Sequence, residues 1–408
     1  MNPNLARLYD YPFTRLRALL NGSSPAGDNA ISLSVGEPQH PPPGFVLEAL
    51  TGALDDLQRY PATQGSEPLR DAIANWLCRR YRLPGSAVDP ASQVLPVQGT
   101  REALFAAAQF IVAGQSSSNN NSIANNNALV AMPSPFYQIY EGAAFMAGAQ
   151  PLYLPCTSAN GFKPDLNAVT EAQWKRCQLF YICNPSNPTG TVYDSSFYAQ
   201  LLSLADRYDF IVASDECYSE IYLDEDKPTP GLLQVCSALG RDKYERCLVF
   251  NSLSKRSNLA GLRSGFVVGD ANLITAFLRY RTYHGSAMPL HHQAASIVAW
   301  QDEEHVIKNR ARYRDKILRS SEVLGDRLEF ELPAGGFCLW ANCGGDDEQF
   351  ALALYREKGV TVLPGSYLAR DTNGENPASG YLRLALVQPL EQCLEAAIRI
   401  CDYIDAKA

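Results

Sequence analysis

One lysine in the middle of the chain stands among residue types that can do covalent chemistry. Lys255 follows two hydroxyl residues, Ser252 and Ser254, and Arg263 comes eight residues after it. The apolar run 247–250 before them is typical of a buried strand, and in open α/β sheets ligand-binding groups gather at the carboxyl ends of strands. A single lysine is most often a solvated surface residue. Together, however, these four side chains could supply an imine-forming amine and a clamp for a phosphate group.

Three other segments place polar groups where a strand ends or a helix begins. Asp215 ends an apolar run; it could cap a helix, or its carboxylate could pair with a protonated pyridine nitrogen. Asn187 lies in the segment 184–190, which is typical of a turn, but an asparagine there could also donate to a phenolate oxygen. Gly99 precedes a predicted helix, whose free N–H groups could hold an anion, although many helices begin this way.

The elements that must position these groups follow two patterns. From about residue 95 to 285, apolar runs of strand length alternate with helical patterns, which predicts an α/β fold with a mainly parallel sheet covered on both faces. The predicted strands are 128–132, 179–183, 210–214, 247–250 and 264–268, and the predicted helices include 102–112 and 195–208.

The last third of the chain changes pattern. A long helical stretch, 293–323, precedes short apolar runs at 336–341, 360–363 and 381–387, which predicts a smaller α+β domain. We expect the first 45 residues to pack with it. The Ser/Asn-rich segment 115–127 has low complexity and is predicted to be a flexible surface insertion.

Composition excludes several classes of protein. With 408 residues the chain is long enough for two or three domains, and its net charge of −8 gives no general attraction to nucleic acid or to an anionic membrane. No apolar run approaches the ~20 residues that span a bilayer, and no secretory signal is evident. Eleven cysteines without a C-x-x-C pair fit reduced thiols in a cytoplasmic protein. The five histidines lack metal-ligand spacing, so we expect no catalytic metal.

The order of these motifs resembles that of the fold-type I aminotransferases of class I/II, which bind pyridoxal 5′-phosphate. The resemblance covers nearly the whole chain, and its most specific segments are 184–190, 214–218 and 252–265. It implies an α/β fold like that of aspartate aminotransferase. A large cofactor-binding domain, 46–288, would have a mainly parallel sheet of the seven-stranded type. Residues 1–45 and 289–408 would form the small α+β domain, which closes over the substrate.

The resemblance also implies roles for the residues around the cofactor ring. Lys255 would hold the cofactor as a Schiff base and move a proton at the substrate α-carbon. Asp215 would keep the pyridine nitrogen protonated. Asn187 and Tyr218 would hydrogen-bond the ring phenolate. Tyr137 matches the aromatic residue that stacks on the ring, and the neighbouring Phe136 is a rival for that role.

Further implied roles concern the phosphate and the substrate. Arg383 lies in an apolar strand, where an unpaired arginine is costly to bury; it either faces water at a sheet edge or, as the resemblance implies, binds the substrate α-carboxylate with Asn187. Gly36 matches the glycine whose backbone contacts that carboxylate. Tyr60 matches a tyrosine that reaches the partner's phosphate across a homodimer with shared active sites. The implied phosphate ligands are Ser252, Ser254, Arg263, Gly99 and the backbone of Thr100 and Arg101.

A closer resemblance is to the N-succinyldiaminopimelate aminotransferases of lysine biosynthesis. It rests on the segments 9–13, 135–142, 215–220, 255–258, 281–285 and 364–368. The implied reaction moves an amino group from N-succinyl-LL-2,6-diaminopimelate to 2-oxoglutarate. Both substrates have a distal carboxylate, so a second cationic group is expected in the pocket. The candidates are Arg15, Arg17, Arg256, Arg281 and His284.

Other functions remain open at this point. The catalytic set is shared by aspartate, alanine and aromatic aminotransferases, because fold and cofactor do not fix the substrate. A β-eliminating lyase would use the same cofactor. A DNA-binding regulator built on this fold is disfavoured, since no basic helix-turn-helix stretch precedes Gly36.

Overall fold

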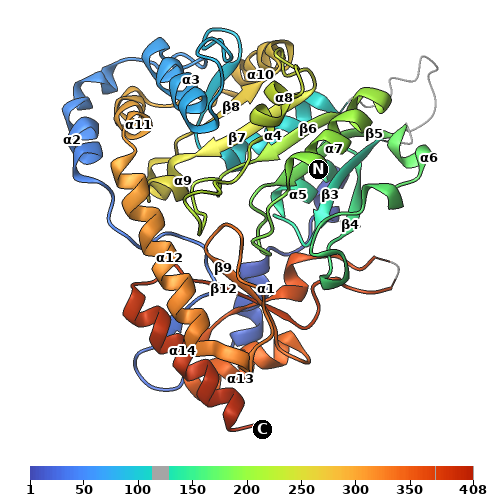
Figure 1. Ribbon diagram of the computed structural model, residues 1–408, viewed down its shortest axis with the longest axis vertical. Helices are drawn as coiled ribbons and strands as arrows, with labels where there is room; N and C mark the ends of the chain where they lie inside the picture. The colour runs from blue at the N-terminus through green and yellow to red at the C-terminus, as the bar shows by residue number, and fades with distance from the viewer. Residues whose placement is uncertain (113–127, 373, 408) are drawn as a thin grey trace.

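The computed structural model describes residues 1–112, 128–372 and 374–407. The predicted insertion 115–127 therefore lies outside the described residues. Figure 1 shows a broad sheet with helices on both of its faces, and a smaller group of strands and helices beside it. The long helix α12 (Glu304–Leu324) runs from one group to the other.

The larger sheet has seven strands in the order β2-β8-β7-β6-β5-β3-β4. All neighbours from β7 to β4 are parallel, and only β8 runs antiparallel to both strands beside it. The predicted mainly parallel sheet is confirmed. The strands are β2 (Val94–Val97), β3 (Leu129–Ser134), β4 (Gln150–Pro155), β5 (Cys177–Cys183), β6 (Ile211–Asp215), β7 (Cys247–Ser252) and β8 (Gly265–Gly269).

Two hydrophobic cores cover the two faces of this sheet, because successive strand residues point to opposite sides. Phe180 and Ile182 belong to one core, and Leu179 and Tyr181 belong to the other. Helices that contribute to the first core are α2 (Gly44–Gly52), α3 (Glu67–Tyr81), α6 (Glu171–Trp174), α7 (Ser195–Tyr208), α8 (Leu232–Ala238) and α11 (Leu290–Gln301). Helices of the second core are α4 (Thr100–Ile111), α5 (Ile139–Met146) and α10 (Ala271–His284).

Sequence patterns missed two strands, β2 and β4, which are the two edges of the sheet. β2 contains Pro96, and β4 begins at Gln150 and contains two prolines. Proline removes a backbone donor and is tolerated in edge strands. The pattern of these two segments is therefore too weak to indicate a strand.

The smaller group is built on an antiparallel sheet in the order β11-β12-β9. Beside it, β1 pairs in parallel with β10, so Ile31 lies opposite Val360. Residues 31 and 32 thus meet the last third of the chain, whereas Arg7 contacts Phe145 and Ala149 of the larger group. The strands are β1 (Ile31–Ser32), β9 (Cys338–Asn342), β10 (Val360–Thr361), β11 (Leu363–Pro364) and β12 (Tyr381–Ala385). The helices are α1 (Pro12–Leu20), α12, α13 (Asp347–Lys358) and α14 (Leu390–Asp405).

The predicted bounds of two elements in this region were wrong. The single helical stretch 293–323 is two helices, α11 and α12, which are separated at Asp302 and Glu303. The Asp302 carboxylate accepts from the N–H of His305 at 3.0 Å and so caps the start of α12. The predicted strand 360–363 is also two strands, β10 and β11, in different sheets. The division into domains at residues 46–288 stays a prediction.

Short elements complete the chain. The one-turn helix α9 (Leu253–Arg256) follows β7 directly. The 3-10 helices are η1 (Pro3–Arg7), η2 (Leu54–Gln58), η3 (Ser158–Asn160), η4 (Leu166–Ala168), η5 (Ala260–Leu262), η6 (Gly325–Arg327) and η7 (Gly365–Leu368). Within the described ranges, no helix is both long and apolar enough to cross a membrane.

Candidate active site

A cavity of about 600 Å³ lies where β5, β6 and β7 end, and residues of the smaller group line its other side. It brings together residues from position 11 to position 383 of the chain. Most of the predicted site residues line it: Gly36, Thr100, Arg101, Tyr137, Asn187, Asp215, Tyr218, Ser252, Ser254, Lys255, Arg263 and Arg383. Two predicted residues, Gly99 and Tyr60, do not.

Lys255 is the amine in this cavity. The end of β7 and the single turn of α9 fix its backbone, and its Nζ donates to the carbonyl oxygen of Gly36. Burial lowers the pKa of Lys255 to about 8. A larger fraction of this amine is therefore neutral near pH 7 than for a surface lysine, and the neutral form is the nucleophile.

Asp215, the last residue of β6, is a buried carboxylate without a cation among the described residues. The Tyr140 hydroxyl donates to its Oδ2 at 2.7 Å, and the backbone N–H of Cys217 donates to its Oδ1 at 3.2 Å. Burial raises the pKa of Asp215. A buried carboxylate is stabilised when a positive group joins it. A protonated ring nitrogen therefore fits this position.

The start of α4 and the segment around α9 present donors suited to a phosphate. Gly99 precedes α4 with φ +80°, and a Cβ at this position would lie 2.8 Å from the Arg263 Cζ. Only glycine therefore lets the guanidinium approach. Arg263 donates to the carbonyl oxygen of Ala260 at 2.8 Å and forms no ion pair within the described ranges. With the hydroxyls of Thr100 and Ser252 beside the positive end of α4, these groups fit a phosphate.

Arg383 enters the cavity from β12. It is only 6% exposed, and it donates to the carbonyl oxygen of Ser34 at 2.7 Å and to the Asn187 Oδ1 at 3.2 Å. Its Nε is buried without a partner. Both acceptors are neutral, so the guanidinium charge is uncompensated in the described parts of the chain. A carboxylate is the group that such an arginine binds most strongly.

The structure distinguishes between Tyr137 and Phe136, the two residues that could stack on the cofactor ring. Tyr137 lines the cavity, and the Arg101 Nε donates to its hydroxyl at 2.7 Å. Phe136 is buried against Tyr153, with ring centroids 5.5 Å apart, and does not line the cavity. Tyr218 lines the cavity, and burial raises the pKa of its phenol. The geometry favours Tyr137 over Phe136.

Tyr60 is fully exposed and lies outside the cavity of its own chain. A role for it requires a second chain and stays a prediction.

None of the five residues suggested for a distal carboxylate lines the cavity. Arg256 is buried and pairs with Glu303 at 2.5 Å, and Arg281 is buried and pairs with Glu102 at 2.6 Å. Arg15 faces Glu348 at 3.5 Å. Arg17 and His284 are exposed on α1 and α10. The suggestion was wrong because carboxylates distant in sequence already compensate three of these charges.

Sequence patterns missed several groups that the structure places at the site. The Arg101 side chain lines the cavity, although only its backbone was assigned a role. Tyr140, which bonds Asp215, and Cys217, whose Sγ lies 3.0 Å from the Thr100 Oγ1, were also missed. Glu37 lines the cavity beside Gly36. Tyr140 lies in the first turn of α5, and its N–H donates to the carbonyl oxygen of Tyr137 at 3.0 Å, so the two residues are neighbours at the start of this helix.

Metal ligands are absent from the part of the chain that the structure describes: no group of three or more His, Cys, Asp or Glu residues there could hold an ion.

Comparison with known proteins gives a consistent result. Residues 28–400 match the family model described as aminotransferase class I and II. An LL-diaminopimelate aminotransferase of Nitratidesulfovibrio vulgaris is 31% identical over 404 residues, 97% of each chain. A solved aminotransferase of Neisseria meningitidis is 45% identical, with a TM-score of 0.92 over 98% of this chain and 99% of that one.

A second solved structure is described as a probable N-succinyldiaminopimelate aminotransferase of Thermus thermophilus. It is 27% identical, with a TM-score of 0.82 over 96% of this chain and all of that one.

Proposed function

Because the chain belongs to the class I and II aminotransferases, we propose that it transfers the amino group of N-succinyl-LL-2,6-diaminopimelate to 2-oxoglutarate. The products are N-succinyl-2-amino-6-oxopimelate and glutamate, in lysine and diaminopimelate biosynthesis. Enzymes of this family depend on pyridoxal 5′-phosphate, which supplies an aldehyde that condenses with amines and a ring that accepts electrons. Family membership favours transamination over the β-eliminating lyase and over a DNA-binding regulator.

The proposed roles of the residues come from the family resemblance, and the positions of most of them around the cavity support these roles. Lys255 holds the cofactor and moves a proton at the substrate α-carbon, which its lowered pKa favours. Asp215 pairs with the ring nitrogen, and Tyr137 stacks on the ring. Asn187 and Tyr218 bond the ring oxygen. The phosphate is held by Ser252, Ser254, Arg263, Gly99 and the backbone of Thr100 and Arg101.

The proposal for the substrate rests on one observation: three arginines line the cavity without a carboxylate partner within the described ranges, and with Arg263 assigned to the phosphate, Arg101 and Arg383 remain for carboxylates. Arg383 is bonded only to neutral acceptors. Arg101 donates to a tyrosine hydroxyl, and its guanidinium lies against the rings of Tyr11 and Tyr137. We assign the α-carboxylate to Arg383, with the backbone of Gly36, and the distal carboxylate to Arg101. Both the proposed amino donor and 2-oxoglutarate have these two groups.

A second candidate donor is LL-diaminopimelate itself. The Nitratidesulfovibrio relative is named for it. Glu37, which lines the cavity, is a carboxylate that could take the free distal ammonium group of this compound. The succinylated donor has no such ammonium, so Glu37 would not contribute to its binding.

The test is a comparison of amino donors with 2-oxoglutarate as acceptor, measured as glutamate formed. We expect kcat/KM for N-succinyl-LL-2,6-diaminopimelate to exceed that for LL-diaminopimelate, aspartate and alanine by tenfold or more, which corresponds to about 1.4 kcal/mol. A higher value for LL-diaminopimelate would establish the second candidate. A higher value for aspartate or alanine would reject both.

A cytoplasmic homodimer is also proposed. Tyr60 is fully exposed, and Leu57 beside it is 65% exposed, which supports a subunit contact at this surface. All eleven cysteines are free thiols, as expected in a reducing compartment. Sedimentation that shows a fully active monomer would contradict the dimer.

A further inference from the structure

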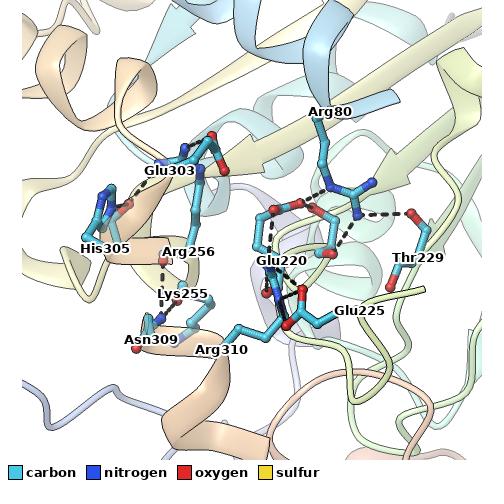
Figure 2. Close-up of polar contacts among 12 residues, drawn as sticks. Arg80, Glu220, Glu225, Thr229, Lys255, Arg256, Glu303, His305, Asn309 and Arg310 are labelled. Atoms are coloured by element: carbon cyan, nitrogen blue, oxygen red, sulfur yellow. Dashed lines mark hydrogen bonds and ion pairs between the residues drawn. The ribbon is translucent and has the colours of Figure 1, made fainter. Parts of the chain in front are cut away.

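Helix α12 contacts the backbone of the segment that contains Lys255. The one-turn helix α9 ends at Arg256, and the last carbonyls of a helix have no partner within it. The Asn309 Nδ2 lies 3.0 Å from the carbonyl oxygen of Lys255 and 3.2 Å from that of Arg256. Figure 2 shows the Asn309 amide directed at this turn. One side chain of α12 therefore caps the helix that positions the lysine.

Asn309 is itself held in place. It is 3% exposed, and the Asn258 Nδ2 donates to its Oδ1 at 2.8 Å. Its buried amide thus uses both its oxygen and its nitrogen on the segment 255–258. Hydrogen bonds of buried groups are costly to leave unmade.

Other contacts fix the start of α12 against the same segment. One turn before Asn309, the His305 Nε2 lies 2.8 Å from the Ser257 Oγ. Glu303 pairs with the buried guanidinium of Arg256. Figure 2 shows His305, Glu303 and Arg256 on the same side of the view as Asn309.

Arg310, the next residue, joins α12 to the loop after β6. Its guanidinium pairs with Glu225 at 2.9 Å and donates to the carbonyl oxygen of Glu220 at 3.2 Å. Glu220 in turn pairs with Arg80 at 2.6 Å, as Figure 2 shows. Breaking a buried ion pair leaves an uncompensated charge. The first turns of α12 are therefore held on the segments that follow β6 and β7 of the seven-stranded sheet.

The other end of α12 belongs to the smaller group of strands. Ile317 and Leu324 share a core with Leu339 of β9 and Leu384 of β12. The Lys316 Nζ donates to the carbonyl oxygen of Val387 at 3.1 Å. From Asn309 to Ile317 the helix rises about 12 Å. One continuous helix therefore contacts both the backbone of Lys255 and the sheet that contains Arg383.

We propose that Asn309 is a positioning residue for Lys255. Its amide fixes the lysine main chain on α12, the helix that also packs on the sheet that holds Arg383. This inference rests on the role proposed above for Lys255.

The test uses purified holoenzyme with Asn309→Ala and Asn309→Asp, and two readouts. Amide hydrogen exchange is measured over residues 253–259, together with kcat and KM for the amino donor. We expect Asn309→Ala to speed exchange in this segment about tenfold, and to lower kcat about tenfold with KM changed less than twofold. Asn309→Asp keeps the shape but has no donor, and it faces two carbonyls with a charge, so its effects should be larger.

Two further variants complete the test. Asn258→Gly removes the bond to the Asn309 Oδ1 and suits the positive φ of +54° at residue 258, so a smaller change in the same direction is expected. It also provides the measurement if the Asn309 variants fail to fold. Asn160→Ala is the matched control, because its amide donates to the carbonyl oxygen of Pro155 in an exposed turn. It should leave both readouts unchanged.

Exchange that rises equally over the whole of α12, or a kcat unchanged in Asn309→Ala, would overturn the positioning role. If Asn309 cannot be replaced, unchanged exchange and kcat in Asn258→Gly would do the same. Failure of the lysine assignment is separate, because it would appear as ordinary turnover in Lys255→Ala, whatever the exchange data show.

Discussion

Replacing Tyr140 by phenylalanine removes one hydroxyl from the buried carboxylate of Asp215. That hydroxyl donates to the Asp215 Oδ2 at 2.7 Å, and the remaining bond comes from the N–H of Cys217 at 3.2 Å. The Tyr140 ring stacks on Tyr181, with centroids 4.7 Å apart, and phenylalanine keeps this contact. The substitution therefore removes the hydroxyl and leaves the ring packing in place.

The size of the effect follows from the charge of the acceptor. A hydrogen bond to a charged group contributes about 1.5–3 kcal/mol, against about 0.5–1.5 kcal/mol for a neutral pair. Burial already raises the pKa of Asp215 above its usual 3.8. Losing a bond to the ionised form raises this pKa further. The variant's loss of unfolding free energy is then fully present above its folded-state pKa for Asp215. This loss becomes smaller as the pH drops and the carboxyl group becomes protonated in both proteins.

The assay is urea unfolding of the cofactor-free protein at several pH values. Tyr140→Phe should lose about 1.5–3 kcal/mol of unfolding free energy at pH 8, and the loss should shrink as the pH falls through the raised pKa of Asp215. The matched control is Tyr181→Phe, whose hydroxyl donates to the neutral carbonyl of Leu104 at 2.6 Å. Its loss should not vary with pH. A loss for Tyr140→Phe that stays constant down to the lowest pH at which the protein is folded would refute the reasoning.

Three other substitutions test the proposed site. Lys255→Ala should abolish turnover and the borohydride-trapped cofactor adduct. In the unsubstituted protein, the rate of cofactor uptake should rise with pH through about 8, because the Lys255 amine loses its proton there. Uptake that is flat with pH would contradict the lowered pKa. Arg101→Gln should lower kcat/KM for the succinylated donor about tenfold or more, as expected for a lost charged hydrogen bond. It should lower kcat/KM for alanine, which has no distal carboxylate, much less. Equal losses for the two donors would reject the distal-carboxylate role. Gly99→Ala should weaken cofactor binding, measured by fluorescence titration, because its Cβ would displace the Arg263 guanidinium; unchanged affinity would show that this contact does not matter.

The sequence predicted the central strands and the site residues that follow them. The strands β3, β5, β6, β7 and β8 are buried on both faces, so their residues form apolar runs that are visible locally. Asp215 and Lys255 stand at or just after the ends of such strands. The edge strand β2 is equally buried, but it is short and contains Pro96, and the edge strand β4 is only partly buried. The break between α11 and α12 was also hidden, because it depends on a cap and on which core each helix enters.

The type and order of the reactive residues were thus fixed by the sequence alone, since each depends on its immediate neighbours. Only the tertiary structure decides which cationic side chains lack a carboxylate partner. Arg256 and Arg281 are compensated by Glu303 and Glu102, the second across 179 positions of the chain. Arg383 meets Ser34 across 349 positions and keeps an uncompensated charge. Charge pairing acts through space, so no local pattern could separate a guanidinium that holds the fold together from one that is left to bind a ligand.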